Sequence, residues 1–304
     1  MVNVIVVGSF VMDFIFETMK RPVKGESVVG KAFSTAPGGK GANQAMQAAL
    51  LGAGVSMVGR VGDDIFGTQI LESLAGAGVD VSYVKRDGAG TACSGIVLDA
   101  EGDNSIVMVP RANMRCERKD VDDAMPALEK AGAVLLQLEI PMKVNEKAVK
   151  AAKKLGKMII MDPAPACPLE DFYYENVDIM TPNETEAAIL SGIEVADVAG
   201  AEKAAAEIAS RGLKTVIVTM GGAGTLLHTG GENRFFPATK VNVKDTTAAG
   251  DSFTGSLAVF LGEGKSLEEA VRLAGVVAAL STTKLGAQPS LPSRAEFERF
   301  LAAL

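Results

Sequence analysis

Short runs of aliphatic and β-branched residues alternate with longer helix-like segments along most of this chain, which limits the folds open to it. Strands are predicted at residues 3–7, 55–61, 133–138, 158–161, 179–181 and 215–219. Helices are predicted at residues 42–51, 67–77, 144–155, 184–191, 201–211, 250–261 and 267–280. This alternation predicts a mostly parallel central sheet with helices on both faces, a three-layer α/β/α sandwich.

Two extended patches, at about residues 13–35 and 92–110, do not follow this rhythm. In the second patch, two apolar runs flank the polar residues 101–104, a pattern that predicts a β-hairpin. We expect the two patches to pair as a small separate sheet, a lid beside the main one. The chain has no repeat of fixed period and no low-complexity linker. Residues 1–304 are therefore predicted to form one domain with this lid inserted in it.

Charge and cysteine usage narrow the class of protein. The formal net charge is −7 and no basic stripe stands out, which argues against a nucleic-acid partner. The cysteines Cys93, Cys116 and Cys167 have neither disulfide-framework nor metal-ligand spacing, as in a reducing compartment. The first residues lack a basic leader, and no apolar segment reaches the roughly 20 residues that span a bilayer. We therefore expect a soluble, cytoplasmic protein with no membrane partner.

The segment Asp245-Thr-Thr-Ala-Ala-Gly-Asp251 joins a strand-like stretch at residues 240–243 to a predicted helix. A glycine-containing turn that leads into a helix directs backbone N–H groups and the positive end of the helix dipole at one place. That place suits the charge of a phosphoryl group in transfer. Asp251 would then take the proton from an attacking hydroxyl. The alternative is that Asp251 only caps the helix.

Two further glycine clusters are candidates for ligand binding. Thr219-Met-Gly-Gly-Ala-Gly224 follows a strand directly and has the composition of a phosphate cradle, or of a tight turn into a hairpin. In Pro37-Gly-Gly-Lys-Gly-Ala-Asn-Gln44, the glycines would let the chain pass close to a ligand, with Lys40 and Asn43 as donors. Asp13 and Glu139 stand at the carboxyl ends of strands, where open α/β sheets bind ligands. The alternative is that Asp13 and Glu139 are solvated loop residues that bind nothing.

Thr181-Pro-Asn-Glu-Thr-Glu186 opens a predicted helix after a short strand. Asn183 could contact a phosphate there, and Glu186 could order the water shell of Mg²⁺. The same residues also make a good helix start by propensity alone, and both interpretations stay open. The charged run at residues 117–123 is expected to be a solvated helix start.

Taken in order, these motifs resemble the ribokinase branch of the PfkB carbohydrate kinase family over almost the whole chain. Gly38-Gly-Lys-Gly-Ala-Asn-Gln44 and Asp245-Thr-Thr-Ala-Ala-Gly-Asp251 are similar to the two signatures of the family. Leu138-Glu139, Asp162-Pro-Ala-Pro165, Thr181-Pro-Asn-Glu184 and Gly286-Ala-Gln-Pro-Ser290 match motifs between and after them. The resemblance implies a ribokinase-like fold and transfer of the γ-phosphoryl group of ATP to the terminal hydroxyl of a pentose, with ribose as the first choice.

The resemblance also implies a role for each matching residue. Asp251 would be the catalytic base, beside an anion hole formed by the amides of Ala248, Ala249 and Gly250. The sugar pocket would be lined by Asp13, Gly39, Lys40, Asn43 and Glu139. The ATP phosphates would contact Asn183, Thr219, Gly221 and Gly224, and Glu186 would support Mg²⁺ through water. A monovalent cation, K⁺, would be held by Asp245 and Ser290 and by the backbone carbonyls of Thr247, Ser281, Lys284 and Gly286. A homodimer through the lid sheet is expected.

Two residues depart from the pattern of the family. Val11 stands where ribokinases carry an Asn that faces the sugar, and Arg111 stands where a Gly is usual. An unpaired sugar hydroxyl in the pocket costs roughly 1–3 kcal/mol. Val11 therefore favours, as alternatives to ribose, a sugar with fewer hydroxyls such as 2-deoxyribose, or a nucleoside. An inactive sugar-binding protein on the same fold is the alternative from another class, and the presence of Asp251 argues against it.

Overall fold

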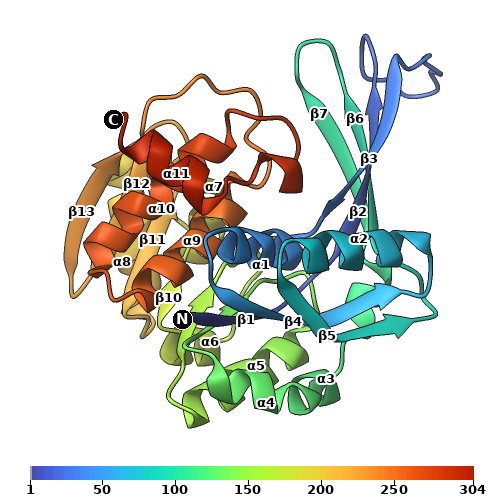
Figure 1. Cartoon of the computed structure of the whole chain (residues 1–304). Helices are drawn as coiled ribbons and strands as arrows, with labels where there is room; N and C mark the ends of the chain where they lie inside the picture. Colours follow the sequence, from blue (N-terminus) through green and yellow to red (C-terminus); the bar gives the residue numbers. More distant parts are fainter. Residues whose placement is uncertain (1) are drawn as a thin grey trace.

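In the computed structural model, which describes residues 2–304, a large sheet forms the centre of the molecule (Figure 1). Its nine strands follow the order β13-β12-β11-β10-β9-β8-β1-β4-β5. The pairings from β11 to β5 are parallel, while β12 pairs antiparallel with both of its neighbours. The strands are β1 Asn3–Val7, β4 Gly54–Gly62, β5 Val79–Asp87, β8 Ala133–Leu136, β9 Met158–Met161, β10 Ile179–Met180, β11 Thr215–Thr219, β12 Gly224–Thr229 and β13 Glu232–Pro237. The predicted mostly parallel sheet is confirmed.

Helices cover both faces of this sheet, because its strands bury side chains on both sides. In β1, Val4 and Val6 join one hydrophobic core and Ile5 and Val7 join the other. The first core includes helices α1 Lys40–Leu50, α2 Ile65–Gly76, α9 Ala249–Gly262, α10 Leu267–Ser281 and α11 Arg294–Leu301. The second includes α3 Arg118–Asp123, α4 Met125–Lys130, α5 Met142–Lys154, α6 Asp171–Asn176, α7 Glu184–Ser191 and α8 Val198–Ser210. Across residues 2–304, none of these helices is both long and apolar enough to cross a membrane.

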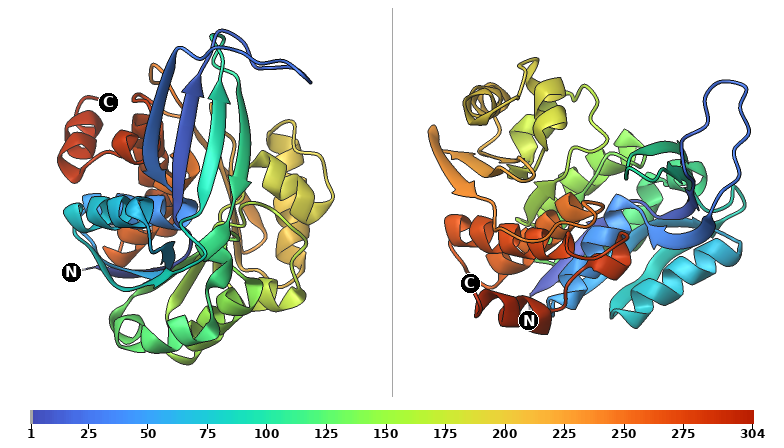
Figure 2. Two further views of the ribbon diagram at one scale, coloured as in Figure 1. Left: turned by 90° about the vertical axis from the view of Figure 1, so that its right-hand side faces the viewer. Right: turned by 90° about the horizontal axis from the view of Figure 1, so that it is seen from above.

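A second, four-stranded sheet rises from one edge of the first, with strand order β3-β2-β6-β7 (Figure 2). It consists of β2 Val11–Glu17, β3 Ala32–Gly38, β6 Cys93–Leu98 and β7 Asn104–Val109. Strand β2 runs parallel to β6 and places Asp13 opposite Ser94, while β6 and β7 form the predicted hairpin. The two extended patches therefore do pair as a small separate sheet.

Two local predictions need correction. Residues 240–243 form no strand. Val241 and Val243 instead line a cavity on the path from β13 to α9 without a sheet partner, Val241 half-buried and Val243 56% exposed. Strand β5 is not predicted from the sequence. Polar residues such as Asp80, Ser82 and Lys85 interrupt its apolar pattern, as an edge strand allows.

The charged run at residues 117–123 is not fully solvated. Helix α3 does begin there, but Asp120 is 1% exposed and accepts hydrogen bonds from Arg60 Nε (2.8 Å) and Nη2 (3.0 Å). The ammonium of Lys85 lies 2.8 Å from the same carboxylate. Burial alone would raise the pKa of Asp120, yet the hydrogen bonds from Arg60 and Lys85 lower it. Arg60 also pairs with Asp87 at 3.2 Å, so this cluster joins β4, β5 and α3.

Candidate active site

Polar side chains from distant parts of the chain meet at the carboxyl end of the large sheet. Lys40 and Asn43 come from the start of α1, Glu139 follows β8, and Asp251 lies in the first turn of α9. Asp13 lies on β2 of the lid, and burial and the nearby charge of Glu139 both raise its pKa. Parallel strands end at one edge of a sheet, so residues that follow different strands come together there.

Asp251 is buried, with 5% of its surface exposed, and its carboxylate is held on both oxygens. Asn43 Nδ2 donates to Oδ2 at 2.9 Å, and Gln44 Nε2 donates to Oδ1 at 3.2 Å. The N-cap of α9 is Ala248, in a left-handed conformation with φ 61°, so Asp251 is not the capping residue. Burial raises the pKa of Asp251, while Lys40 and these two amides act in the opposite direction.

Glu139 connects the start of α1 to Ser9, which follows β1. Its carboxylate accepts hydrogen bonds from the hydroxyl of Ser9 and from the backbone amide of Lys40, the latter at 3.1 Å. Burial raises the pKa of Glu139, and the contacts to Ser9 and Lys40 counter that rise. In the lid, Asp13 accepts a hydrogen bond of 2.5 Å from the Ser94 hydroxyl. Neither carboxylate is the solvated loop residue of the alternative interpretation.

The glycines around Lys40 approach another part of the chain. A Cβ on Gly39 would lie 2.7 Å from the backbone nitrogen of Val11, and one on Gly41 would lie 2.6 Å from that of Ser9. Gly39 also has φ 96°, a conformation that favours glycine. These glycines therefore let the start of α1 pack against residues 8–11. The sequence motif predicts close approach to a ligand; what Gly39 and Gly41 approach in the structure is the backbone of residues 8–11, which connects β1 to the lid.

Asp162 and Gln44 belong to the site, although no role was assigned to them from the sequence. Asp162 is buried directly after β9, its carboxylate accepts a 2.9 Å hydrogen bond from Gln44 Nε2, and the Lys40 ammonium lies 4.0 Å away. Burial would lower the pKa of Lys40, but Asp162, Asp251 and Glu139 raise it, so the ammonium stays charged. The position of Asp162 immediately after a buried strand, like that of Glu139, was the available signal.

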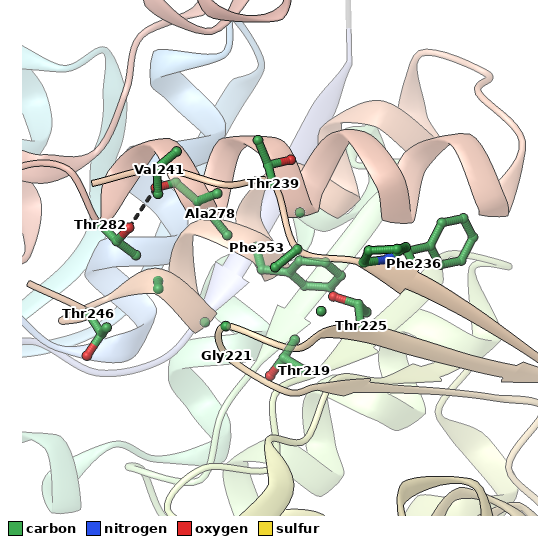
Figure 3. A pocket seen from close by; sticks show the side chains of 18 of the residues that line it. Thr219, Gly221, Thr225, Phe236, Thr239, Val241, Thr246, Phe253, Ala278 and Thr282 are labelled. Atoms are coloured by element: carbon green, nitrogen blue, oxygen red, sulfur yellow. Dashed lines mark hydrogen bonds between the residues drawn. The ribbon is translucent and has the colours of Figure 1, made fainter. Parts of the chain in front are cut away.

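A cavity of about 330 Å³ adjoins these residues between α10 and the β11–β13 strands (Figure 3). Thr219, Gly221 and Gly224 line it together with Asn183 and Gly250. All four residues predicted to contact phosphates therefore share one cleft with the first turn of α9.

The glycines of this cleft differ in what surrounds them. A Cβ on Gly221 or Gly250 would meet no atom within 4 Å, so these positions are open. A Cβ on Gly224 would lie 2.1 Å from the carbonyl oxygen of Phe236. Gly224 is thus required by the hairpin that follows, as the tight-turn interpretation held, while Gly221 leaves room for a ligand.

Asn183 and Glu186 cap helix α7 with each other. The side chain of Asn183 accepts from the Glu186 amide at 2.9 Å, and a Glu186 carboxylate oxygen accepts from the Asn183 amide at 2.8 Å. The helix-start interpretation of this motif is therefore correct. It does not compete with ligand binding, because Asn183 also lines the cleft.

Asp245 joins two loops beside the first turn of α9. Its Oδ1 accepts from the amide (2.9 Å) and the hydroxyl (2.6 Å) of Thr247, and its Oδ2 accepts from the amide of Gly286 (2.8 Å). Burial would raise the pKa of Asp245, but these hydrogen bonds lower it, so the carboxylate is ionised at neutral pH. Asp245, Thr247 and Gly286, predicted to bind one cation, therefore lie together.

Ser281, Lys284 and Ser290 complete the predicted cation set around the end of α10. The Ser281 carbonyl accepts from the Lys284 amide at 3.3 Å, and Ser290 is buried with its hydroxyl donating to the Ala287 carbonyl at 2.7 Å. The Lys284 ammonium pairs with Glu296, at 2.7 Å. The predicted ligand is the backbone carbonyl of Lys284, and this ion pair does not involve it.

The two departures from the family pattern have different surroundings. Val11 is buried at the start of β2, on the same face of the lid as Asp13. Arg111 has φ 35°, in the region that favours glycine, and its guanidinium donates to the carbonyls of Ala89 (3.0 Å) and Thr91 (3.3 Å). The contacts of Arg111 are therefore with the 89–91 loop, whereas Val11 lies beside Asp13, which is predicted to line the sugar pocket.

Comparisons with known proteins agree with this arrangement. Residues 1–294 match the model of the pfkB family of carbohydrate kinases. The chain is 41% identical to a ribokinase of Bacillus subtilis, covering 99% of each chain, and 36% identical to a deoxyribokinase of Salmonella typhi with the same coverage. A solved structure of Arabidopsis thaliana ribokinase complexed with ribose and ATP superposes with a TM-score of 0.93 at 37% identity, covering 99% of each chain. The predicted family and fold are thus confirmed: the chain belongs to the pfkB family of carbohydrate kinases.

Proposed function

We propose that this enzyme transfers the γ-phosphoryl group of ATP to the 5-hydroxyl of ribose, with Asp251 as the general base. The observation that carries the proposal is the position of Asp251, buried in the first turn of α9. It lies between the polar cluster of Lys40, Asn43 and Glu139 and the glycine-lined cleft. The names of the relatives support ribose as the acceptor.

The base role requires an ionised carboxylate aimed at the hydroxyl. Asp251 accepts two amide hydrogen bonds, which fix its orientation, and the open backbone at Gly250 leaves room for phosphoryl oxygens near the helix start. The amides of Ala248, Ala249 and Gly250 would stabilise the charge that develops there. Because burial raises the pKa of Asp251, turnover should fall with acidification at a higher pH than an exposed Asp would give.

The sugar would be bound between the lid and the start of α1. Asp13, Asn43 and Glu139 provide acceptors and donors for hydroxyl groups, and the Gly39 backbone is pressed against the first residues of the lid. We propose that residues 1–304 act as one catalytic domain whose lid covers the sugar and excludes water, which limits hydrolysis of ATP.

The residues present fit ATP and its cations. The 330 Å³ cleft and its open glycine turn suit a nucleotide, and Glu186 uses one carboxylate oxygen in the helix cap while Mg²⁺ typically keeps several waters. The Asp245 loop supplies oxygen donors of the kind that K⁺ prefers. Bound Mg²⁺ would neutralise charge on the phosphates, and K⁺ would do so beside the anion hole. Loss of turnover without Mg²⁺, and reduced turnover when tetramethylammonium replaces K⁺, are the expected results.

Filling the cleft at Gly275 should weaken ATP binding selectively. Gly275 lies in the middle of α10 and lines the cleft, and a Cβ there would meet no atom within 4 Å. Gly275→Leu should therefore fold well, since leucine favours helices more than glycine does, yet raise the KM for ATP at least about tenfold. Gly76→Leu, at an equally open position at the end of α2, is the control. An unchanged KM for ATP in Gly275→Leu would place the nucleotide elsewhere.

Val11 favours 2-deoxyribose as a second candidate substrate, and a relative named deoxyribokinase gives this alternative weight. A buried Val beside Asp13 offers no hydrogen bond to a sugar hydroxyl. Val11→Asn should raise the preference for ribose over 2-deoxyribose by about 5- to 150-fold. A coupled ADP-release assay with ribose, 2-deoxyribose, other pentoses, hexoses and nucleosides measures the substrate preference of the wild type and of Val11→Asn. An unaltered preference for ribose over 2-deoxyribose in Val11→Asn would mean that Val11 does not set the choice of sugar.

We also propose that the enzyme forms a homodimer through the lid. On the face opposite Asp13, the large apolar side chains of Phe16, Phe33, Val107 and Val109 are between 44% and 71% exposed. Contiguous exposed apolar surface of this kind marks a protein contact. Sedimentation equilibrium should report a dimer, and a purely monomeric species at micromolar concentration would contradict the proposal.

A further inference from the structure

The amide of Gln44 bridges two buried carboxylates. Its Nε2 donates one hydrogen bond to Asp162 Oδ2 at 2.9 Å and another to Asp251 Oδ1 at 3.2 Å. Gln44 itself is 0% exposed. An amide nitrogen carries two hydrogens, so both are used, one on each carboxylate.

Gln137 fixes which way this amide points. Gln137 Nε2 donates to Gln44 Oε1 at 2.6 Å, and Asn145 Nδ2 holds the backbone carbonyl of Gln137 at 2.7 Å. A Cβ on Gly8 would lie 2.1 Å from Gln137 Oε1, so the chain leaves this side chain little room. If the Gln44 amide were reversed, its oxygen would face two carboxylates and its NH₂ would face another NH₂. The chain of hydrogen bonds from Asn145 through Gln137 to Gln44 therefore ends in a donor directed at Asp251.

The surrounding charges make this donor important. Asp251 is faced by one cation, Lys40 from α1, and by two other acidic side chains, Asp162 after β9 and Glu139 after β8. The single Lys40 ammonium lies nearest to Asp162, at 4.0 Å. Neutral amides thus supply the direct hydrogen bonds to Asp251, and buried hydrogen bonds to an ionised group are among the stronger ones.

We propose that Gln44 is a positioning residue for the phosphoryl transfer: it holds the Asp251 carboxylate ionised and aimed at the acceptor hydroxyl, and ties it to Asp162. This role rests on the proposed function, in which Asp251 is the base. Asn43 secures the other oxygen of Asp251, so Gln44 and Asn43 together leave the carboxylate one orientation. Gln44 does not itself meet the reacting atoms.

Gln44→Leu tests the proposal, with Gln47→Leu as the matched control. Both residues are fully buried amides of α1, but Gln47 contacts the Pro292 carbonyl and the Ser252 hydroxyl instead of a carboxylate. Gln44→Leu should lower kcat roughly 10- to 100-fold with little change in the KM for ATP. It should also move the acid limb of the kcat–pH profile upward by about one pH unit, because the ionised form of Asp251 loses a donor. Gln47→Leu should leave that limb unmoved.

The outcomes separate this role from a structural one and from failure of the proposed function. Coincident acid limbs for wild type and Gln44→Leu would overturn the positioning role, even if kcat had fallen. If Gln44→Leu does not fold, Gln137→Leu loosens Gln44 without touching either carboxylate. It should shift the limb in the same direction by a smaller amount, and no shift overturns the proposal. A wild-type enzyme that phosphorylates no sugar would refute the proposed function itself, and the positioning role with it.

Discussion

Replacing Asp251 by Asn should reduce kcat by about 10²- to 10⁴-fold while the affinity for ribose changes little. The amide keeps the size and the buried position of the side chain, but it cannot accept the proton of the acceptor hydroxyl. Sugar binding should persist, since Asp13, Asn43 and Glu139 are unaltered. The coupled ADP-release assay measures turnover, and isothermal titration calorimetry with ribose measures binding.

Asp197→Asn is the matched control for this prediction. Asp197 is an exposed helix cap on α8, where its side chain accepts from the Gly200 amide at 2.7 Å, and Asn caps helices about as well as Asp. Its turnover should match that of the wild type. Near wild-type turnover in Asp251→Asn would rule out the base assignment, whatever its effect on binding.

Replacing Arg60 by Met should lower the free energy of unfolding by about 3–5 kcal/mol. The change removes two hydrogen bonds from Asp120, which is 1% exposed, and leaves Lys85 as its remaining cation. Lys85 also pairs with Asp123, so it cannot fully compensate. Urea denaturation followed by circular dichroism measures the loss. Turnover per folded molecule should be retained, since this cluster is separate from the residues around Asp251.

Two comparisons sharpen the stability prediction. Lys265→Met breaks an exposed pair with Glu269 on neighbouring turns and should change stability by no more than about 0.5 kcal/mol. The double variant Arg60→Met with Asp120→Leu removes the stranded charge and should recover part of the loss. If Arg60→Met were as stable as Lys265→Met, water would have to reach Asp120 and solvate it.

Much of the architecture follows from the amino-acid order, because hydrophobic periodicity is a local property. The alternating segments after residue 133 predict the parallel sheet, and the two patches near 13–35 and 92–110 predict the lid. Motif spacing likewise singled out Asp251, Asn43 and Glu139, which the fold does bring together. Local patterns failed at residues 240–243, where the apolar side chains line an open cavity and have no strand partner.

Only the tertiary structure decided which polar groups form hydrogen bonds and ion pairs with one another. Gln44 and Asp251 are 207 residues apart, and Asp162 stands between them in sequence, so no spacing rule links the three. Asp120 of α3 likewise belongs to a charged run that the sequence alone predicts to be solvated, but Arg60 of β4 pairs with it in the fold. Burial and long-range pairing arise only when the layers close. The sequence by itself therefore determined the layers and indicated the candidate site residues, whereas the closed fold determined which of their charges are paired.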